Sequence, residues 1–174
     1  MDVEDSLLVS HSDLVYQLNE EAIGANRVRQ EQPVMVVLGN PPYNGDSKNQ
    51  GTYITDLMSE YAMKGSNGAL NDDYIKFIRY AQNLVDQNGS GVVAYISNNS
   101  FLSSVAMENM RKSLLESFDE IYVLNLYGRP IDDNIFASIK QQVAVYYLVK
   151  DGSKEAGQKS VSYTHLTLPT NREV

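Results

Sequence analysis

A run of five apolar residues at 34–38, VMVVL, is followed after Gly39 by an Asn and two consecutive prolines. The run is rich in β-branched residues and has no polar face, which predicts a strand buried inside a parallel sheet. A proline lacks the N–H group that a central strand needs, so the chain is expected to turn at Pro41 and Pro42. Residues 40–43 are therefore predicted at the carboxyl end of a buried strand, where open α/β sheets bind their ligands.

Apolar runs and helical spacing predict the remaining elements. Further strands are expected at 92–97, 121–126 and 142–149, and helices at 12–30, 52–63, 72–87 and 105–118. Candidate N-caps for the helix at 72–87 are Asn71, Asp72 and Asp73. The order strand, helix, strand, helix, strand is typical of an α/β fold with a parallel sheet. The last of these strands follows a connection without a helical pattern, so we expect it to run antiparallel to its neighbour.

The composition excludes several classes of protein. No apolar run approaches the roughly 18 residues of a membrane span, and the acidic first residues do not resemble a signal peptide. The chain has no cysteine and only two distant histidines, His11 and His165, so we expect neither disulfides nor a metal site, and a cytoplasmic location. The net charge of −8 argues against tight binding of nucleic-acid phosphates by this chain alone.

The segment VVLGNPPY at 36–43 resembles the catalytic motif of amino-methyltransferases. Four downstream blocks follow in the order seen in adenine-specific DNA methyltransferases: DDYIKFIRYAQNLV, GVVAYISNNSFL, MRKSLLESFDEIYVLNLYG and NIFASIKQQVAVYYLVK. Over residues 20–150 the chain thus resembles the N6-adenine DNA methyltransferases of restriction–modification systems, of the Eco57I-like and type ISP-like groups. The resemblance implies the C-terminal half of a Rossmann-like class I methyltransferase sheet.

The resemblance also implies the roles of the motif residues. The implied catalytic residues are Asn40, Pro41, Pro42 and Tyr43. The Asn40 side-chain oxygen and the Pro41 carbonyl would accept the two N–H bonds of the target adenine amine, which attacks the methyl group of S-adenosyl-L-methionine. Tyr43 would stack on the adenine once that base has flipped out of double-stranded DNA.

Weaker candidates surround this motif. Four side chains are expected to line the pocket for the base, with a plain turn or core packing as the alternative: Asn98, Asn99, Phe101 and Phe136. Three basic side chains are candidates for phosphate contacts, with a solvated surface as the alternative: Lys48, Lys76 and Arg79.

The sequence lacks the glycine-rich loop with which such enzymes hold S-adenosyl-L-methionine. Residues 89–91 read Gly-Ser-Gly, but they precede a predicted strand and are interpreted as a turn between helix and strand. We therefore expect the cofactor-binding half upstream and a target-recognition region downstream of this chain. The isolated chain is expected to be inactive.

Four segments follow from these patterns: an N-terminal helical connector at 1–32, the catalytic half at 33–150, a polar linker at 151–160 and a tail at 161–174. Within the tail, SYTHLTLPT resembles the translation of a sequencing-library adapter. The tail is therefore expected not to be native, to pack poorly and to add no strand to the sheet, with a short Thr-rich strand as the alternative.

Two other functions stay open. The motif suits any planar amine or amide, so a methyltransferase that acts on a protein glutamine or on RNA is one alternative. The second is a non-catalytic fragment with a role in assembly.

Overall fold

The chain forms two compact units, Met1–Pro33 and Val34–Val174, which are described separately. A computed structural model describes residues 16, 19–24, 27, 33–62, 68–127, 142–152 and 159–167, with 127 and 165–167 described by backbone alone. In the first unit, residues 19–24 are helical and fall inside the predicted helix at 12–30, much of which lies outside the described residues.

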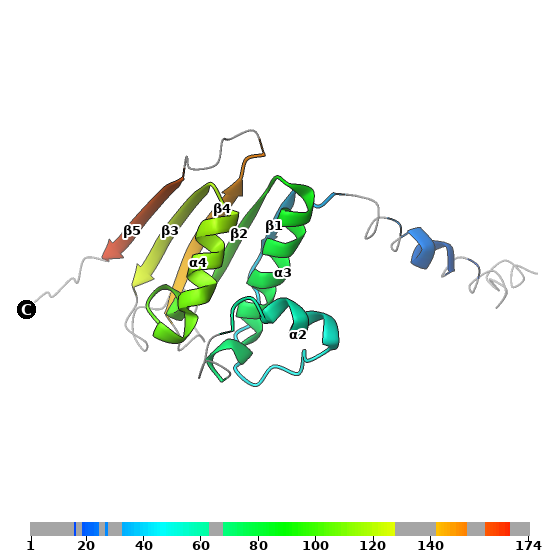
Figure 1. Cartoon of the computed structure of the whole chain (residues 1–174), viewed down its shortest axis with the longest axis horizontal. Helices are drawn as coiled ribbons and strands as arrows, with labels where there is room; N and C mark the ends of the chain where they lie inside the picture. The colour runs from blue at the N-terminus through cyan, green and yellow to red at the C-terminus, as the bar shows by residue number, and fades with distance from the viewer. Residues whose placement is uncertain are drawn as a thin grey trace, which may run out of the picture. The chain divides into compact units, whose positions relative to one another are not determined.

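The second unit is built on a five-stranded sheet with the order β1-β2-β4-β3-β5 (Figure 1). The strands are β1 (Val36–Gly39), β2 (Gly91–Asn98), β3 (Glu120–Tyr127), β4 (Val143–Lys150) and β5 (Ser160–Thr167). The four predicted strands are confirmed to within two residues at each end. β1 pairs in parallel with β2, and β4 runs antiparallel to both β2 and β3, as expected for the last predicted strand.

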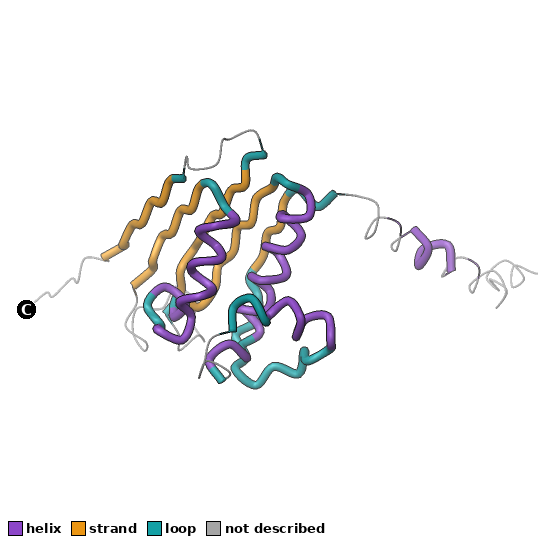
Figure 2. The backbone as a smooth tube through the Cα atoms, in the orientation of Figure 1, coloured by secondary structure: helices purple, strands orange, loops and turns teal. Residues whose placement is uncertain are grey.

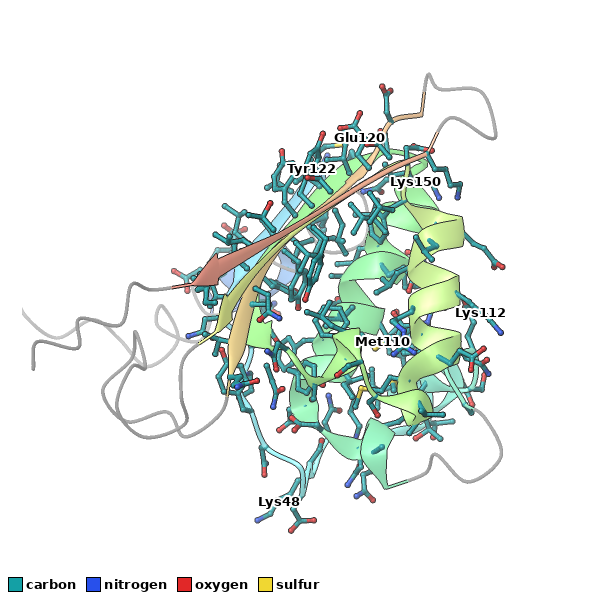
Figure 3. All side chains as sticks on the ribbon, turned by 90° about the vertical axis from the view of Figure 1, so that its left-hand side faces the viewer. Lys48, Met110, Lys112, Glu120, Tyr122 and Lys150 are labelled. Carbon is teal, nitrogen blue, oxygen red and sulfur yellow. The ribbon has the colours of Figure 1, made fainter. Side chains whose placement is uncertain are left out.

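Helices cover one face of this sheet, as the tube in Figure 2 and the turned view in Figure 3 both show. The helical segments are α2 (Thr52–Met58), η1 (Ala69–Asn71), α3 (Asp73–Asn88), η2 (Ser100–Leu102), η3 (Val105–Met107) and α4 (Glu108–Ser117). Asp72 is the N-cap of α3, because its side chain accepts a hydrogen bond from the Tyr74 N–H group, and α3 ends at Gly89 with a φ of 77°. None of the described helices is long and apolar enough to cross a membrane.

The core lies between these helices and the sheet. Its fully buried side chains include Tyr61, Tyr74, Ile75, Ile78, Val85, Val93, Met110, Phe118 and Tyr146. The Tyr146 ring lies edge-on to both Tyr95 and Phe101, with centroids 5.9 and 5.3 Å away. The apolar sides of α3 and α4 therefore cover one face of the sheet, and alternate side chains of β2 and β4 point toward these helices.

One prediction, about the burial of β1, is wrong on the opposite face of the sheet. β1 was expected to be buried on both faces, yet it lies at the edge of the sheet, and the Val36 and Leu38 side chains are 54% and 71% exposed. Tyr122 and Tyr147 form an exposed ring pair on the same face, 6.1 Å apart. Apolarity on both faces of a segment reflects burial in its final surroundings, and no helix among the described residues covers this face.

A second prediction, about the tail at 161–174, is also wrong. It was expected to add no strand, but β5 pairs in parallel with β3 over its whole length. The free edge of β3 offers unpaired N–H and C=O groups, and a segment rich in Thr, Val and Tyr readily pairs with such an edge. The exposure of Val161 and Tyr163, 58% and 44%, shows that β5 lies at the rim of the sheet and outside the core.

Candidate functional site

The segment Asn40–Tyr43 leaves the carboxyl end of β1, as predicted. Lys48, in the loop that follows, lies at the opposite end of the sheet from Glu120, the first residue of β3 (Figure 3). Pro41 is buried while Asn40 is exposed, so the motif is anchored by a proline ring and presents the Asn40 side chain to solvent. The strands β1, β2 and β3 run in the same direction, so their carboxyl ends lie at the same edge of the sheet as the motif.

The Tyr43 side chain folds back onto the motif. Its hydroxyl group donates to Asn40 Oδ1 at 2.9 Å and lies 3.2 Å from the main-chain oxygen of Ile96 in β2. One hydroxyl proton serves both acceptors in turn. Burial raises the pKa of Tyr43, so the hydroxyl stays protonated and remains a donor at neutral pH. The side-chain oxygen of Asn40 thus already accepts one of its two possible hydrogen bonds from its own neighbour.

Two of the basic candidates for phosphate contacts are buried, and each already interacts with other residues of the chain. Lys76 is 6% exposed, and its Nζ donates to Ser47 Oγ at 3.0 Å and to the main-chain oxygen of Asn49 at 2.7 Å. Arg79 is 7% exposed; it forms an ion pair with Glu60. Both readings of Lys76 and Arg79, a phosphate contact and a solvated surface, are therefore wrong, because helix α3 turns both side chains inward. Lys48 is exposed and stays a candidate.

The end of β2 shapes a turn beside the motif. Asn98 Oδ1 accepts a hydrogen bond from the Ser100 N–H group at 2.8 Å, which begins the turn η2. Phe101 is 5% exposed and packs in the core against Tyr146. Phe136 lies outside the described residues. A contact of these side chains with a base stays a prediction.

Asn99, a predicted pocket residue, belongs to a polar cluster beneath this turn that the sequence did not predict. Asn99 Nδ2 donates to Asn125 Oδ1, and Asn125 Nδ2 donates to the Tyr163 hydroxyl group, both at 2.9 Å. Asn125 is 3% exposed. The available signal was the single amide inside the apolar strand IYVLNLY, since an amide buried in such a strand requires partners. A cavity of about 320 Å³ lies next to this cluster, and Asn40–Tyr43 do not line it.

The glycine-rich turn that would cradle a nucleotide-like cofactor is not found among the described residues. Their only glycines with positive φ are Gly89, directly after α3, and Gly91, the first residue of β2. They form the turn between helix and strand that the sequence predicts. Among the described side chains, no group of three or more His, Cys, Asp or Glu residues is placed to hold a metal ion.

Comparison with known families and structures places the chain among restriction–modification enzymes. The profile of the family described as Eco57I restriction-modification methylase matches residues 10–131. A nuclease-deletion mutant of the Type ISP restriction-modification enzyme LlaGI, in complex with a DNA substrate mimic, is 26% identical with a TM-score of 0.72, covering 90% of this chain and 16% of that one.

Two further structures are similar. The ATP-dependent Type ISP restriction-modification enzyme LlaBIII bound to DNA is 28% identical with a TM-score of 0.68, over 90% of this chain and 12% of its own. The DrdV–DNA complex is 28% identical with a TM-score of 0.67, over 84% of this chain and 16% of its own. The chain thus spans between 12% and 16% of the length of these relatives. No match was found among curated proteins.

Proposed function

Because this chain belongs to the Eco57I restriction-modification methylase family, we propose that it carries the catalytic motif of an S-adenosylmethionine-dependent DNA adenine-N6 methyltransferase. The observation that carries the proposal is the meeting of an exposed amide and an aromatic ring at the carboxyl end of β1. Asn40 Oδ1 and the Tyr43 hydroxyl are 2.9 Å apart, so an acceptor for an amine and a surface for a flat ring lie together.

The adenine amine is a poor nucleophile because its lone pair is delocalised into the ring. In the proposed mechanism, Asn40 Oδ1 accepts one of its N–H bonds and the Pro41 carbonyl accepts the other. These contacts localise the lone pair and stabilise the positive charge that develops on the nitrogen. The buried ring of Pro41 restricts the backbone, so the acceptors are oriented before the base arrives.

Tyr43 has a second task in this proposal. Its hydroxyl donates to the same Asn40 oxygen that the amine needs. A flipped adenine competes with that hydroxyl for the oxygen, and the tyrosine ring turns to stack on the base. Asn98, at the neighbouring strand end, is proposed to border the same pocket, together with Phe136, while Phe101 supports the turn from the core.

S-adenosylmethionine supplies an electrophilic methyl group when it is bound. The residues described do not fit this cofactor, because their positive-φ glycines lie at the start of β2, and no glycine-rich turn follows a described strand. We propose that a cofactor-binding segment outside this chain pairs with the free edge of β1. The position of β1 at the edge of the sheet supports this, since a strand apolar on both faces is suited to the interior of a sheet.

Double-stranded DNA is the proposed partner. The three relatives described above have all been solved with DNA or a DNA mimic. The net charge of −8 and the burial of Lys76 and Arg79 leave little basic surface here, so the phosphate contacts are assigned to other parts of the enzyme, including a target-recognition region.

The test is transfer of a labelled methyl group by the intact enzyme to duplex DNA, RNA and protein, followed by digestion and identification of the methylated residue. We expect N6-methyladenine in the duplex, and a loss of turnover on the order of 10²–10³ for Asn40→Ala. Asn83→Ala is the control, because Asn83 lies on the exposed side of α3 and bonds to Tyr53.

Each other outcome identifies an alternative. Label on a glutamine side chain or on RNA would replace the DNA substrate, since the same two acceptors suit an amide or an RNA base. No transfer to any of the three substrates would favour a role in assembly. Near-normal turnover of Asn40→Ala would reduce the motif to a structural turn.

A further inference from the structure

Asn44, the residue after Tyr43, is held by the first turn of α3. Its main-chain N–H group donates to Asp72 Oδ1 at 2.9 Å, and its main-chain oxygen accepts from the Asp73 N–H group at 3.1 Å. Its side-chain amide donates to Asp73 Oδ2 at 3.2 Å. Both main-chain polar groups and the side chain of Asn44 are thus bound by two consecutive residues that lie 28 and 29 positions further along the chain.

A buried lysine secures the loop that follows. Lys76, one turn into α3, donates from Nζ to Ser47 Oγ, to the main-chain oxygen of Asn49 and to Asn71 Oδ1. Ser47 is 1% exposed, and its hydroxyl group donates to the second carboxylate oxygen of Asp73. Asp73 therefore joins the two anchors, because one of its oxygens binds Asn44 and the other binds Ser47.

We propose that the hydrogen-bonded group of Asn44, Asp72 and Asp73, here named the Asn44 latch, positions Tyr43 and Asn40 for the target base. These three are positioning residues and touch no reacting atom. Pro41 and Pro42 restrict the backbone between the strand and Tyr43, so this segment has few accessible conformations. Holding the peptide group directly after Tyr43 then sets where the tyrosine ring stands. This inference rests on the proposed function, since it gives the latch a role in that reaction.

The latch also accounts for a charge arrangement that helix propensity leaves unexplained. Asp72 is the N-cap of α3, and Asp73 is the acidic residue of its first turn. Either acid alone would satisfy the positive end of the helix dipole. The two carboxylates together present three oxygens to partners in the loop and the helix: Asp72 Oδ1, Asp73 Oδ1 and Asp73 Oδ2.

The experiment uses the intact enzyme with Asn44→Ala, Asp73→Ala and the double variant. We expect Asp73→Ala to lower kcat roughly 10- to 100-fold and Asn44→Ala, which keeps both main-chain bonds of the latch, to lower it less. The Kd for DNA should change by less than about twofold in both, because a misplaced ring affects the reacting geometry more than the binding of the duplex. The double variant should be no slower than the worse single variant, because the residues act as one unit.

Three further variants separate positioning from general stability. Asp86→Ala is the matched control: Asp86 lies at the other end of α3 and binds Ser117 and Lys150, so its loss weakens packing and leaves the loop intact. We expect a lower unfolding midpoint with unchanged kcat. Asp72→Asn keeps an oxygen acceptor and should retain most of the wild-type kcat, whereas Asp72→Ala should not.

A second measurement does not depend on activity. Amide hydrogen exchange of the peptide that covers residues 40–50 should be faster in Asp73→Ala than in wild type and unchanged in Asp86→Ala. Equal exchange in all three proteins would overturn the latch. Wild-type kcat in Asn44→Ala and Asp73→Ala, in an enzyme that Asn40→Ala inactivates, would overturn the positioning role while leaving the proposed function standing. An inactive wild-type enzyme would overturn the proposed function, and with it the role of the latch in that reaction, whatever the exchange rates.

Discussion

Tyr43 offers the sharpest test, because its hydroxyl and its ring are assigned opposite effects. The hydroxyl donates to Asn40 Oδ1 at 2.9 Å and competes there with an incoming amine. A neutral hydrogen bond of this kind contributes about 0.5–1.5 kcal/mol, so its loss in Tyr43→Phe should favour entry of the base by about 2- to 10-fold. The ring contributes about 1–3 kcal/mol by stacking, so Tyr43→Ala should weaken the binding of the flipped base by about 5- to 150-fold.

The assay uses the intact enzyme and a duplex with a fluorescent adenine analogue at the target position. Fluorescence reports how much of the base is flipped and unstacked, and single-turnover methylation of the normal duplex reports the chemical step. Tyr43→Phe should keep its rate within about tenfold of wild type, while Tyr43→Ala should lose both rate and base capture. The control pair is Tyr53→Phe and Tyr53→Ala, since Tyr53 is an exposed tyrosine on α2 that is 57% accessible and outside the motif.

One result would refute this reasoning. If Tyr43→Phe were as damaging as Tyr43→Ala, the hydroxyl would carry the function, and its bond to Asn40 would be part of the active arrangement. The ring would then have no separate stacking role.

Three further outcomes follow from the fold. Lys76→Met removes three hydrogen bonds from a buried ammonium group, so the free energy of unfolding in urea should fall by about 2–4 kcal/mol, whereas Lys48→Met, at an exposed position of the same loop, should leave it unchanged. Gly89→Ala should lower the free energy of unfolding by about 1 kcal/mol, because the φ of 77° suits glycine, and a thermal melt would detect this. Burial raises the pKa values of Tyr74 and Tyr95 to about 12 from a usual value of 10.0, so their contribution to stability is complete below pH 10 and is lost as pH rises from 10 through 12. Urea unfolding at pH 8, 10 and 11, followed beside tyrosinate absorbance, would contradict this if stability stayed constant.

Local patterns in the sequence were sufficient to predict several structural features of this chain. The apolar run before two prolines placed the motif at a strand end, because proline cannot donate to a central ladder. Asp72 was predicted among the N-caps of α3, and the Gly-Ser-Gly turn after α3 was recognised as a link to β2. Each of these depends on backbone preferences within a few residues, which are readable without knowledge of distant contacts.

Contacts between distant residues decided the rest. The antiparallel direction of β4 was expected, but its insertion between β2 and β3 depends on which edges pair, and no local pattern encodes that choice. Lys76 looks the same in sequence as an exposed lysine, and only the approach of the loop at Ser47 makes it a buried anchor. β5 exists because the edge of β3 is free to accept it.

The motif itself shows most clearly which features the sequence determined and which the tertiary structure decided. The sequence alone determined that Asn40 and Tyr43 follow a strand, because the residue types and their order set the turn. Only the tertiary structure decided that the Tyr43 hydroxyl meets both Asn40 and the end of β2, and that α3 holds Asn44 directly after them. These contacts join segments separated by up to 53 residues, and their stability comes from packing and hydrogen bonds that form only when the sheet and helix have assembled.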